Sequence, residues 1–265
     1  MSKEIYTRAN FRSSLLKQII IRADYSSLTD LNGFIMKLKS LEWLRELFAG
    51  YRPVRTNNFN LQISPKAIEE RFIPLEVNET GTIHRFFDCK IGPIQDIVMD
   101  ISSTFICFTI RCNDKYETID PYINYVTRII DSLKKYDSYV QIERLAIRKI
   151  DGKDCQSLEE AYEIFEVMEG LGRGITDGVS PIKKSYTDSF LSEEFNIKVN
   201  FTRGLERFSN GTIRCVLDMD GYVDSSLINP DENIKSLLED RINNELFKLF
   251  KESVTENFLK QGLIS

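Results

Sequence analysis

The segment LDMDGYVD, residues 217–224, contains the side chains that are best suited to chemistry. Asp218 and Asp220 are separated by one residue, and Asp224 follows after Gly221. Carboxylates at this spacing are typical of cation-binding loops and of phosphoryl-transfer sites, in which an aspartate is the nucleophile and Mg²⁺ joins the acids. The alternative is that these aspartates form the outer face of a β-strand and bind no ligand.

Two specific motifs can be tested against this segment. LDMDGYV resembles the hhhDxDG(T/V) start of haloacid-dehalogenase-like phosphotransferases, but in that fold most of the domain follows the motif. Here only about forty residues follow Asp224. A calcium loop that begins at Asp218 would need glycine where Val223 stands and a bidentate glutamate where Asn229 stands. The segment therefore completes neither motif.

Hydrophobic alternation gives a simpler interpretation of residues 213–224. The residues on one face are apolar: Ile213, Cys215, Leu217, Met219 and Val223. The other face carries polar and charged residues: Arg214, Asp218, Asp220, Tyr222 and Asp224. A period of two is typical of a half-buried strand. We predict such a strand with an acidic outer face, and a ligand site on that face is the alternative.

Arg144 and Arg148 lie on one face of the predicted strand VQIERLAIRKID, residues 140–151. Two arginines at this spacing could bind an anion, or they could neutralise the acids of another strand. We expect the second arrangement, with both guanidinium groups within about 4 Å of Asp218 or Asp220. The candidate binding residues are therefore Arg144, Arg148, Asp218, Asp220 and Tyr222.

The remaining motifs predict no further site. The single histidine, His84, is expected to be a surface or sheet residue, and it limits the histidine-dependent chemistry open to the chain. The segment GLGRGITDG follows a predicted helix and lacks the spacing of a nucleotide-binding loop. The five cysteines form no CxxC pair, so we expect reduced core cysteines, as in a cytoplasm. We assign no catalytic residue, no cofactor and no metal.

Composition restricts the class of protein. The chain has 265 residues, 42% of them hydrophobic, and a formal net charge of −5. These values are typical of a globular protein, and the acidic balance disfavours nucleic acid as a partner. No apolar run approaches the roughly 18 residues of a membrane helix, and the first residues lack an apolar signal core. We therefore expect a cytoplasmic protein that contacts no membrane.

Residues 1–155 are expected to form an N-terminal half. Alternating residues predict strands at 17–25, 55–63, 82–90, 96–102, 104–112 and 140–151. Apolar side chains spaced by three and four residues predict a helix over 28–50 that ends at Gly50 and a helix over 119–136 that is capped by Asp120. Short strands in succession favour an antiparallel meander.

Residues 156–265 are expected to form a C-terminal half, joined through a glycine-rich loop at 170–181. Ser157 and Glu160 form a capping box that begins a short helix. Further strands are predicted at 183–192, 196–208 and 211–224, followed by a long helix from 229 to 262. We predict an α+β protein of two related halves, each a mainly antiparallel meandering sheet packed on long amphipathic helices.

The order of three segments resembles a sporadically distributed, TIGR-type family of uncharacterised prokaryotic proteins. The segments are ERLAIRKID, LDMDGYVD and, in the last helix, FKLFKESVTENFL. The middle strand of that family is similar to RxGLRYIN, whose arginines Arg144 and Arg148 match, while Lys149 and Asp151 replace its tyrosine and asparagine. Its later strand is similar to LDIDxY, matched by Leu217, Asp218, Met219, Asp220 and Tyr222. The resemblance implies a patchily inherited cytoplasmic protein of a prokaryote, and such inheritance is common for genes of mobile elements and antiviral defence.

Two functional hypotheses follow. The first is a non-catalytic binding or interaction protein, acting as an accessory or sensing component of a mobile-element or antiviral defence system. Its expected partner is another protein, either the product of a neighbouring gene or a second copy of the chain. The alternative is a metal-dependent hydrolase or nuclease-like effector in which Asp218 and Asp220, together with Asp224, gather Mg²⁺.

Overall fold

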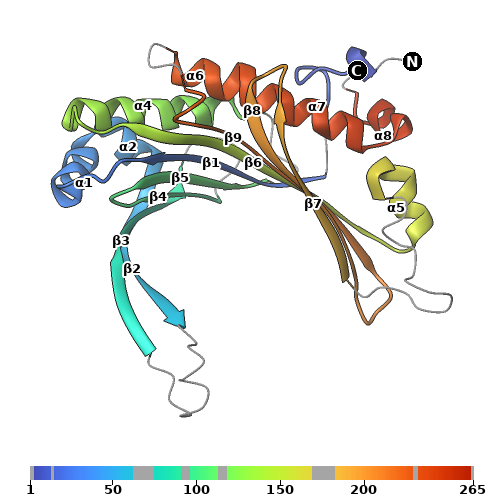
Figure 1. The fold of residues 1–265 in the computed structure, drawn as a ribbon, viewed down its shortest axis with the longest axis horizontal. Coiled ribbons are helices and arrows are strands. Elements are labelled where there is room, and N and C mark those ends of the chain that lie inside the picture. The colour runs from blue at the N-terminus through green and yellow to red at the C-terminus, as the bar shows by residue number, and fades with distance from the viewer. Residues whose placement is uncertain are drawn as a thin grey trace.

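The computed structural model describes residues 3–12, 15–61, 75–90, 96–112, 118–168, 183–228 and 232–263. Within them, nine strands form one antiparallel sheet in the order β2-β3-β4-β5-β1-β6-β9-β8-β7 (Figure 1). The strands are β1 (Leu16–Tyr25), β2 (Phe48–Leu61), β3 (Leu75–Cys89), β4 (Ile97–Ile101), β5 (Phe105–Arg111), β6 (Ile142–Cys155), β7 (Lys183–Ser192), β8 (Ile197–Arg207) and β9 (Ile213–Asp224).

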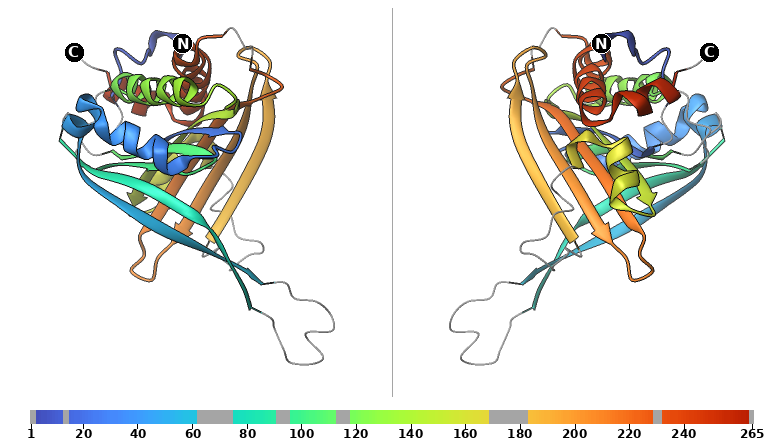
Figure 2. Two further views of the ribbon diagram at one scale, coloured as in Figure 1. Left: turned by 90° about the vertical axis from the view of Figure 1, so that its left-hand side faces the viewer. Right: turned by 90° about the vertical axis from the view of Figure 1, so that its right-hand side faces the viewer.

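Helices cover one face of this sheet, and the two ends of the chain lie on the same side (Figures 1 and 2). They are η1 (Lys3–Ile5), α1 (Leu31–Ser40), α2 (Glu42–Leu47), α4 (Asp120–Tyr136), α5 (Leu158–Ile164), η2 (Glu166–Met168), α6 (Ile234–Ser236), η3 (Leu237–Ile242), α7 (Asn243–Ser253) and α8 (Glu256–Gln261). Among the described residues, no helix has the length and apolar character needed to cross a membrane. The predicted α+β class with a mainly antiparallel sheet is confirmed.

The predicted boundary near residue 155 falls at a junction inside the sheet. Residues 1–155 supply the neighbouring strands from β2 to β6, and residues 156–265 supply β9, β8 and β7. The two groups meet where β6 pairs with β9, in a continuous register from Arg144 opposite Asp224 to Cys155 opposite Ile213. The halves thus share one sheet, and the prediction that they are related to each other remains a prediction.

Alternating burial defines the two faces of the sheet. In β1 the side chains of Ile19, Ile21 and Ala23 are fully buried under the helices, whereas Arg22 and Asp24 point to the other face and are half-buried. Strand β9 follows the same rule, and its predicted apolar face is buried throughout. We call the face opposite the helices the open face, because the described residues place no helix over it (Figure 2).

The helix predicted over 28–50 is wrong in its extent. It is divided at Leu41, whose backbone is extended, and α2 ends at Leu47. Gly50 is not a helix stop but lies within β2, where a Cβ would come within 2.4 Å of the Phe87 ring. The glycine therefore allows a close approach between β2 and β3. The prediction that Asp120 caps α4 is also wrong, because Asp120 is the first helical residue and no side chain caps that helix.

The C-terminal helix is interrupted, contrary to the prediction of one continuous helix. It begins at Ile234 after Asn233, whose side chain accepts a hydrogen bond from the Lys235 amide, and it widens to π-helical geometry in η3. It then ends at Ser253, and Thr255 caps the separate helix α8. The predicted apolar stripe is nevertheless buried at Leu238, Ile242, Leu246, Phe250 and Val254. Residues 229–231, the connector at 170–181 and the end of the strand predicted over 55–63 lie outside the described residues.

Gly221 fixes how closely the C-terminal helices approach β9. A Cβ on Gly221 would lie 3.0 Å from Leu246 Cδ2 and 3.2 Å from Ile242 Cγ2. Gly204 in β8 is a contrast, because a Cβ there would make contacts of 3.9 Å with Ser185 and 4.0 Å with Val216, which are ordinary packing distances. The two glycines therefore stand in strands of the same sheet but in different surroundings.

We expect Gly221→Val to lower the free energy of unfolding by about 1–3 kcal/mol, because the branched side chain would push η3 and α7 away from the sheet. Gly204→Val is the control, and it should be neutral or stabilising by up to about 1 kcal/mol, since valine favours strands. Urea denaturation of both variants measures the difference. Equal losses at the two positions would contradict the packing argument.

Candidate functional site

The open face carries a row of oppositely charged side chains that runs from β3 to β8, which we call the ion-pair row. Its members are Arg85, Asp100, Arg22, Asp24, Arg144, Asp220, Arg148, Asp218, Lys198 and Asp224. The row contains all four charged residues of the predicted site, and Tyr222 lies within it. The sequence therefore identified the central part of a larger arrangement.

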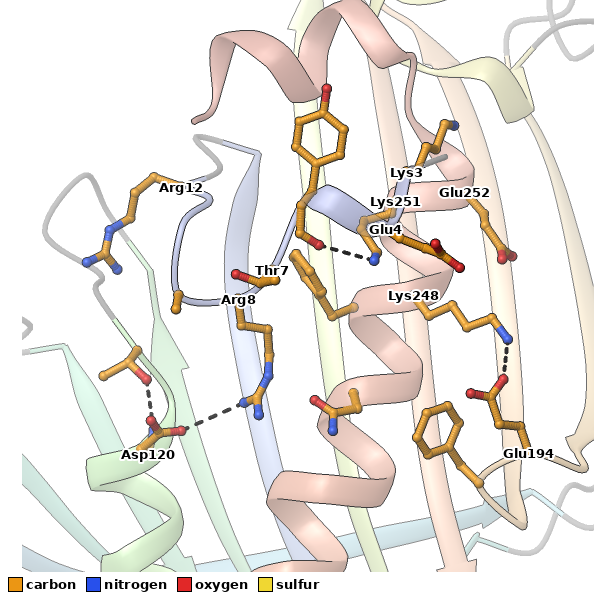
Figure 3. A pocket seen from close by; sticks show the side chains of 16 residues that line it. Lys3, Glu4, Thr7, Arg8, Arg12, Asp120, Glu194, Lys248, Lys251 and Glu252 are labelled. Carbon is orange, nitrogen blue, oxygen red and sulfur yellow. Dashed lines mark hydrogen bonds and ion pairs between the residues drawn. The ribbon is translucent and has the colours of Figure 1, made fainter. Parts of the chain in front are cut away.

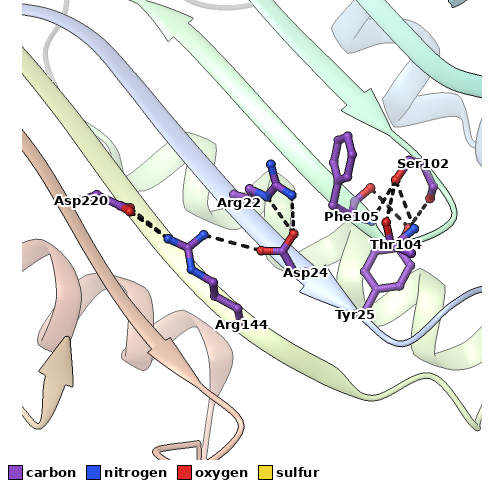
Figure 4. A network of polar contacts seen from close by, with 8 residues as sticks. All are labelled: Arg22, Asp24, Tyr25, Ser102, Thr104, Phe105, Arg144 and Asp220. Carbon is purple, nitrogen blue, oxygen red and sulfur yellow. Dashed lines mark hydrogen bonds and ion pairs between the residues drawn. The ribbon is translucent and has the colours of Figure 1, made fainter. Parts of the chain in front are cut away.

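Arg144 is the bridge at the centre of the row (Figure 4). Its Nη2 donates to both carboxylate oxygens of Asp220, at 2.9 and 3.2 Å, and its Nη1 lies 3.5 Å from Asp24 Oδ2. Asp24 also accepts a hydrogen bond of 2.8 Å from Arg22 Nε. Arg144 thus links β6 to strands on both sides of it, β1 and β9.

The pairing of Arg144 is diagonal rather than directly across the strands. Asp224 stands opposite Arg144 in the β6–β9 register, but Asp224 pairs with Lys198 of β8 and accepts a hydrogen bond from Ser226. Arg144 instead lies over the ring of Tyr222, with its Cζ 4.5 Å from the ring centroid, and reaches Asp220 beyond it. Tyr222 therefore supports the extended arginine through a cation–π contact.

Arg148 forms the second predicted pair. Its Nε and Nη2 donate to the two carboxylate oxygens of Asp218 at 2.7 and 2.5 Å, a bidentate arrangement. This hydrogen bonding raises the pKa of Arg148 above its ordinary value. Both arginines thus lie within 4 Å of their aspartates, and the prediction that they neutralise Asp218 and Asp220 is confirmed.

Solvent exposure separates the two pairs. The side chains of Arg144 and Asp220 are 27% and 23% exposed, while those of Arg148 and Asp218 are 45% and 20% exposed. A guanidinium group that is almost half exposed is well screened by water, so its ion pair contributes little to stability. Arg144 is less exposed and serves two carboxylates, so we expect it to matter more.

The end of β1 is held in place by a tyrosine that faces the core. Tyr25 Oη donates a hydrogen bond of 2.7 Å to the Ser102 carbonyl in the turn between β4 and β5 (Figure 4). Arg22 Cζ lies 4.5 Å from the ring centroid of Phe105, which is the first residue of β5. These contacts fix the strand end that presents Asp24 to Arg144.

The site predicted from the sequence did not include the outer pairs of the row, although Asp224 was placed on the polar face of its strand. Arg85 donates to both oxygens of Asp100 at 2.7 Å, between β3 and β4, and Lys198 pairs with Asp224. The signal that could have identified them is the same alternation of apolar and polar residues by which Asp218 and Asp220 were found. In β1, Arg22 and Asp24 are likewise two residues apart on the polar face of a predicted strand.

The aspartates of 217–224 are engaged by cations of the protein itself. Asp218 and Asp220 each accept two hydrogen bonds from a guanidinium group. Among the described residues, no three His, Cys, Asp or Glu side chains are grouped in a way that could hold a metal ion. This arrangement gives no support to a phosphoryl-transfer or calcium site in the segment.

His84 lies in β3 on the helix-covered face, away from the ion-pair row. Its Nδ1 is 2.7 Å from the Tyr51 hydroxyl oxygen, and its side chain is buried. Burial lowers the pKa of His84, and the neighbouring Lys39 lowers it further. The histidine is thus a sheet residue, as expected, and we assign it a role in packing.

A groove of about 950 Å³ lies on the helical side, between the N-terminal segment, the start of α4 and α7 (Figure 3). Charges of both signs line it, and two pairs form between them: Lys248 Nζ lies 2.6 Å from Glu194, and Arg8 Nη1 lies 3.9 Å from Asp120. Lys251 donates to the Tyr6 carbonyl at 3.2 Å. This charge balance favours neither an anionic nor a cationic ligand.

Lys149 and Asp151 form a buried polar pair on the helix-covered side of β6. Burial lowers the pKa of Lys149 and raises that of Asp151, and each residue partly offsets the shift of the other. These are the two positions at which the chain departs from the resembled family. They lie on the face opposite Arg144 and Arg148, so they belong to the core rather than to the open face.

Comparison of the chain with models of known protein families and with curated proteins gives no match to either. The resemblance to a prokaryotic family therefore remains a prediction that depends on the residues quoted for it. The geometry of the open face is the stronger basis for a functional proposal, since it does not depend on relatives.

We expect Arg144→Met to lower the free energy of unfolding by on the order of 1–3 kcal/mol, because two half-buried carboxylates, those of Asp220 and Asp24, would each lose a cation. Arg148→Met should cost less than about 1 kcal/mol, since Arg148 is more exposed. Arg214→Met is the control, because Arg214 and Asp154 are 49% and 52% exposed in a separate pair. Three equal losses in urea denaturation would refute the ranking.

The buried carboxyl group of Asp151 predicts a specific pH dependence. Burial raises the pKa of Asp151 from 3.8 to about 7 in the folded protein. Between these pH values the folded state holds a proton that the unfolded state has released, so stability falls as the pH rises. Asp151→Asn removes this titration. The difference in free energy of unfolding between the variant and the wild type should therefore shift in favour of the variant by more than about 1 kcal/mol when the pH is raised from 4 to 7.

Asp154→Asn on the same strand is the matched control for this pH series. The hydrogen bond from Arg214 lowers the pKa of Asp154, so its carboxylate stabilises the fold above its unfolded pKa and loses this effect as the pH falls. Its replacement should therefore leave the pH dependence between pH 4 and pH 7 nearly unchanged, and only below about pH 4 should it remove a loss of stability, one that occurs as the pH falls. A pH profile for Asp151→Asn parallel to the wild-type profile would contradict a raised pKa.

Proposed function

We propose that the protein is a non-catalytic binding protein whose open face receives a protein partner. The observation that carries this proposal is the ion-pair row, which extends across the open face without a covering helix among the described residues. In this row the guanidinium and carboxylate groups hold one another in fixed positions on a face that the described helices leave uncovered.

The chemistry of this face suits a polar, specific contact. Half-buried ion pairs such as Arg144–Asp220 present both signs of charge in fixed positions, and a partner can meet them with complementary charges. Arginine and tyrosine side chains, here Arg144 and Tyr222, are enriched where protein interfaces contribute most to affinity. The acidic net charge of −5 supports a protein partner over a nucleic acid.

The hydrolase hypothesis has weaker support. Asp218 and Asp220 would have to release Arg148 and Arg144 before they could coordinate Mg²⁺, and this would leave two arginines without partners on the same face. A binding face needs no such rearrangement. We therefore favour binding over metal-dependent cleavage.

The biological setting follows from the sequence resemblance alone. We propose an accessory or sensing role in a mobile-element or antiviral defence system of a prokaryote, in the cytoplasm and without a membrane partner. The binding partner would then be encoded by a neighbouring gene. If that gene is deleted, the partner that binds the open face should no longer be recovered in affinity purification from the native cell.

A charge swap on the open face tests the proposal. The double variant Arg148→Asp with Asp218→Arg preserves an ion pair inside the protein but inverts the charge pattern that a partner meets. Quantitative affinity purification from the native cell should recover at least tenfold less partner with this variant than with the wild type, at an unchanged melting temperature. Equal recovery would show that the open face does not bind the partner.

The control swap lies on the opposite side of the molecule. Glu256 and Lys260 of α8 form a partly exposed pair with a distance of 3.2 Å, and Glu256→Lys with Lys260→Glu should leave recovery unchanged. The hydrolase hypothesis is tested separately with purified protein, Mg²⁺ and nucleic acid or phosphoester substrates. Cleavage that Asp218→Asn with Asp220→Asn abolishes without loss of folding would favour the enzyme over the binding protein.

A further inference from the structure

The two edges of the sheet differ in how they resist pairing with another strand. At one edge, β2 contains Pro53, exposed arginines at 52 and 55, and a register irregularity between Arg55 and Asn57. Proline, charge and bulges are the features by which proteins protect sheet edges. The edge at β2 is thus protected against association.

The other edge, at β7, carries charged side chains but has neither a proline nor a register irregularity. Its ten residues contain no proline, and they pair with β8 in unbroken register from Lys183 to Ser192. Within the described residues, no strand lies on the outer side of β7. A regular ten-residue strand at the edge of a sheet directs part of its backbone amides and carbonyls away from the sheet, and these groups are a template for a further strand.

Strand β7 also exposes large apolar side chains. Tyr186, Phe190 and Leu191 are 51%, 37% and 51% exposed, although they stand in one strand. Tyr186 and Phe190 point to the helix-covered side of the strand, and Leu191 points to the open face. Of the three, Tyr186 lies at the middle of the stretch Lys183–Ser189, and an aromatic ring this exposed on a sheet edge is better suited to burial in an interface than to water.

We propose that β7 pairs with β7 of a second copy of this chain, antiparallel and about a two-fold axis through Tyr186. In this register Lys184 stands opposite the partner subunit's Asp188, and Asp188 stands opposite the partner subunit's Lys184. The Tyr186 side chains meet at the axis. Two opposite-charge pairs therefore flank an aromatic pair on one face of the joined sheet.

Charge complementarity selects this register from its neighbours. An axis through Asp188 would place the two aspartates opposite each other, which is destabilising. Axes through Ser185 or Thr187 would leave Lys184 opposite an aromatic residue. The Asp188 side chain is 57% exposed although it pairs with Arg203 at 2.6 Å, so it is accessible to a second cation.

The pairing would join two sheets into one, with both open faces on the same side. A two-fold axis perpendicular to the sheet preserves the face to which each side chain points, as antiparallel pairing requires. Each dimer would then present two ion-pair rows to its surroundings. This inference concerns a different surface from the partner-binding face and does not depend on it.

Mixing two single variants tests both the interface and the register. Sedimentation velocity over a concentration series should show that the wild type dimerises. Lys184→Glu and Asp188→Lys should each weaken the dimer roughly tenfold or more, because each places like charges opposite each other twice. An equimolar mixture should restore dimers, since every opposing pair in the heterodimer is again of opposite charge.

Three results would overturn the proposal: a wild type that stays monomeric at every concentration, variants that dimerise as the wild type does, or a mixture that stays monomeric. Arg55→Glu on the β2 edge is the control and should leave dimerisation unchanged. Circular dichroism of each variant shows whether it is folded. The open-face swap of Arg148 and Asp218 should not alter dimerisation, so failure of one proposal is distinguishable from failure of the other.

Discussion

Strand β6 carries the constraint on which the rest of the structure depends, because it must pair on both sides and present opposite chemistry on its two faces. It joins β1 on one side and β9 on the other, and these pairings unite the strands from the two ends of the sequence. Leu145 and Ile147 face the helices, while Arg144 and Arg148 face the open side. A shift of one residue in either pairing would place arginines in the core and leucines in water.

The ion-pair row follows from this constraint. The helices bury one face, and the open face must carry polar residues on strands that pack closely side by side. Charges such as those of Arg144, Asp24 and Asp220 lie partly out of water there, and they persist because each has a partner of opposite sign. The row can thus be understood first as a solution to partial burial, and the same order makes it suited to recognition.

The sequence predicted some elements closely and others only in part: α4 was predicted within one residue, whereas the strands predicted at 55–63 and 82–90 lacked the first seven residues of β2 and of β3. Alternation is a direct record of burial on one face, so β7 was predicted at both ends and β9 within two residues. The helix over 28–50 failed because its apolar spacing continues past Leu41, where the backbone turns and then enters β2. The break after Ser253 was not predicted for a similar reason, since Val254 continues the apolar stripe and is buried although the helix has ended.

The candidate site was predicted in composition but not in detail. The pairing of arginines with aspartates followed from the need to neutralise charge, yet the diagonal contact of Arg144 with Asp220 depends on Tyr222 and on Lys198 of a third strand. Sheet order and register bring these residues together, and neither can be predicted from the sequence of one strand. The outer members, such as Arg85 and Asp100, depend in the same way on which strands are neighbours.

The position of β1 has a consequence for the synthesis of the chain. It leaves the ribosome before the other described strands of the sheet, and its neighbours β5 and β6 come much later: Ile19 pairs with Ile110, about 90 residues further on, and Gln18 with Ile150, about 130 residues further on. Until β5 has been synthesised, the consecutive isoleucines Ile19, Ile20 and Ile21 lack the neighbouring strands with which they pair in the described sheet. Pairings this distant are slow to form, and an unpaired apolar strand is prone to aggregate. The nascent protein is thus expected to depend on chaperones until β1 has paired with β5 and β6.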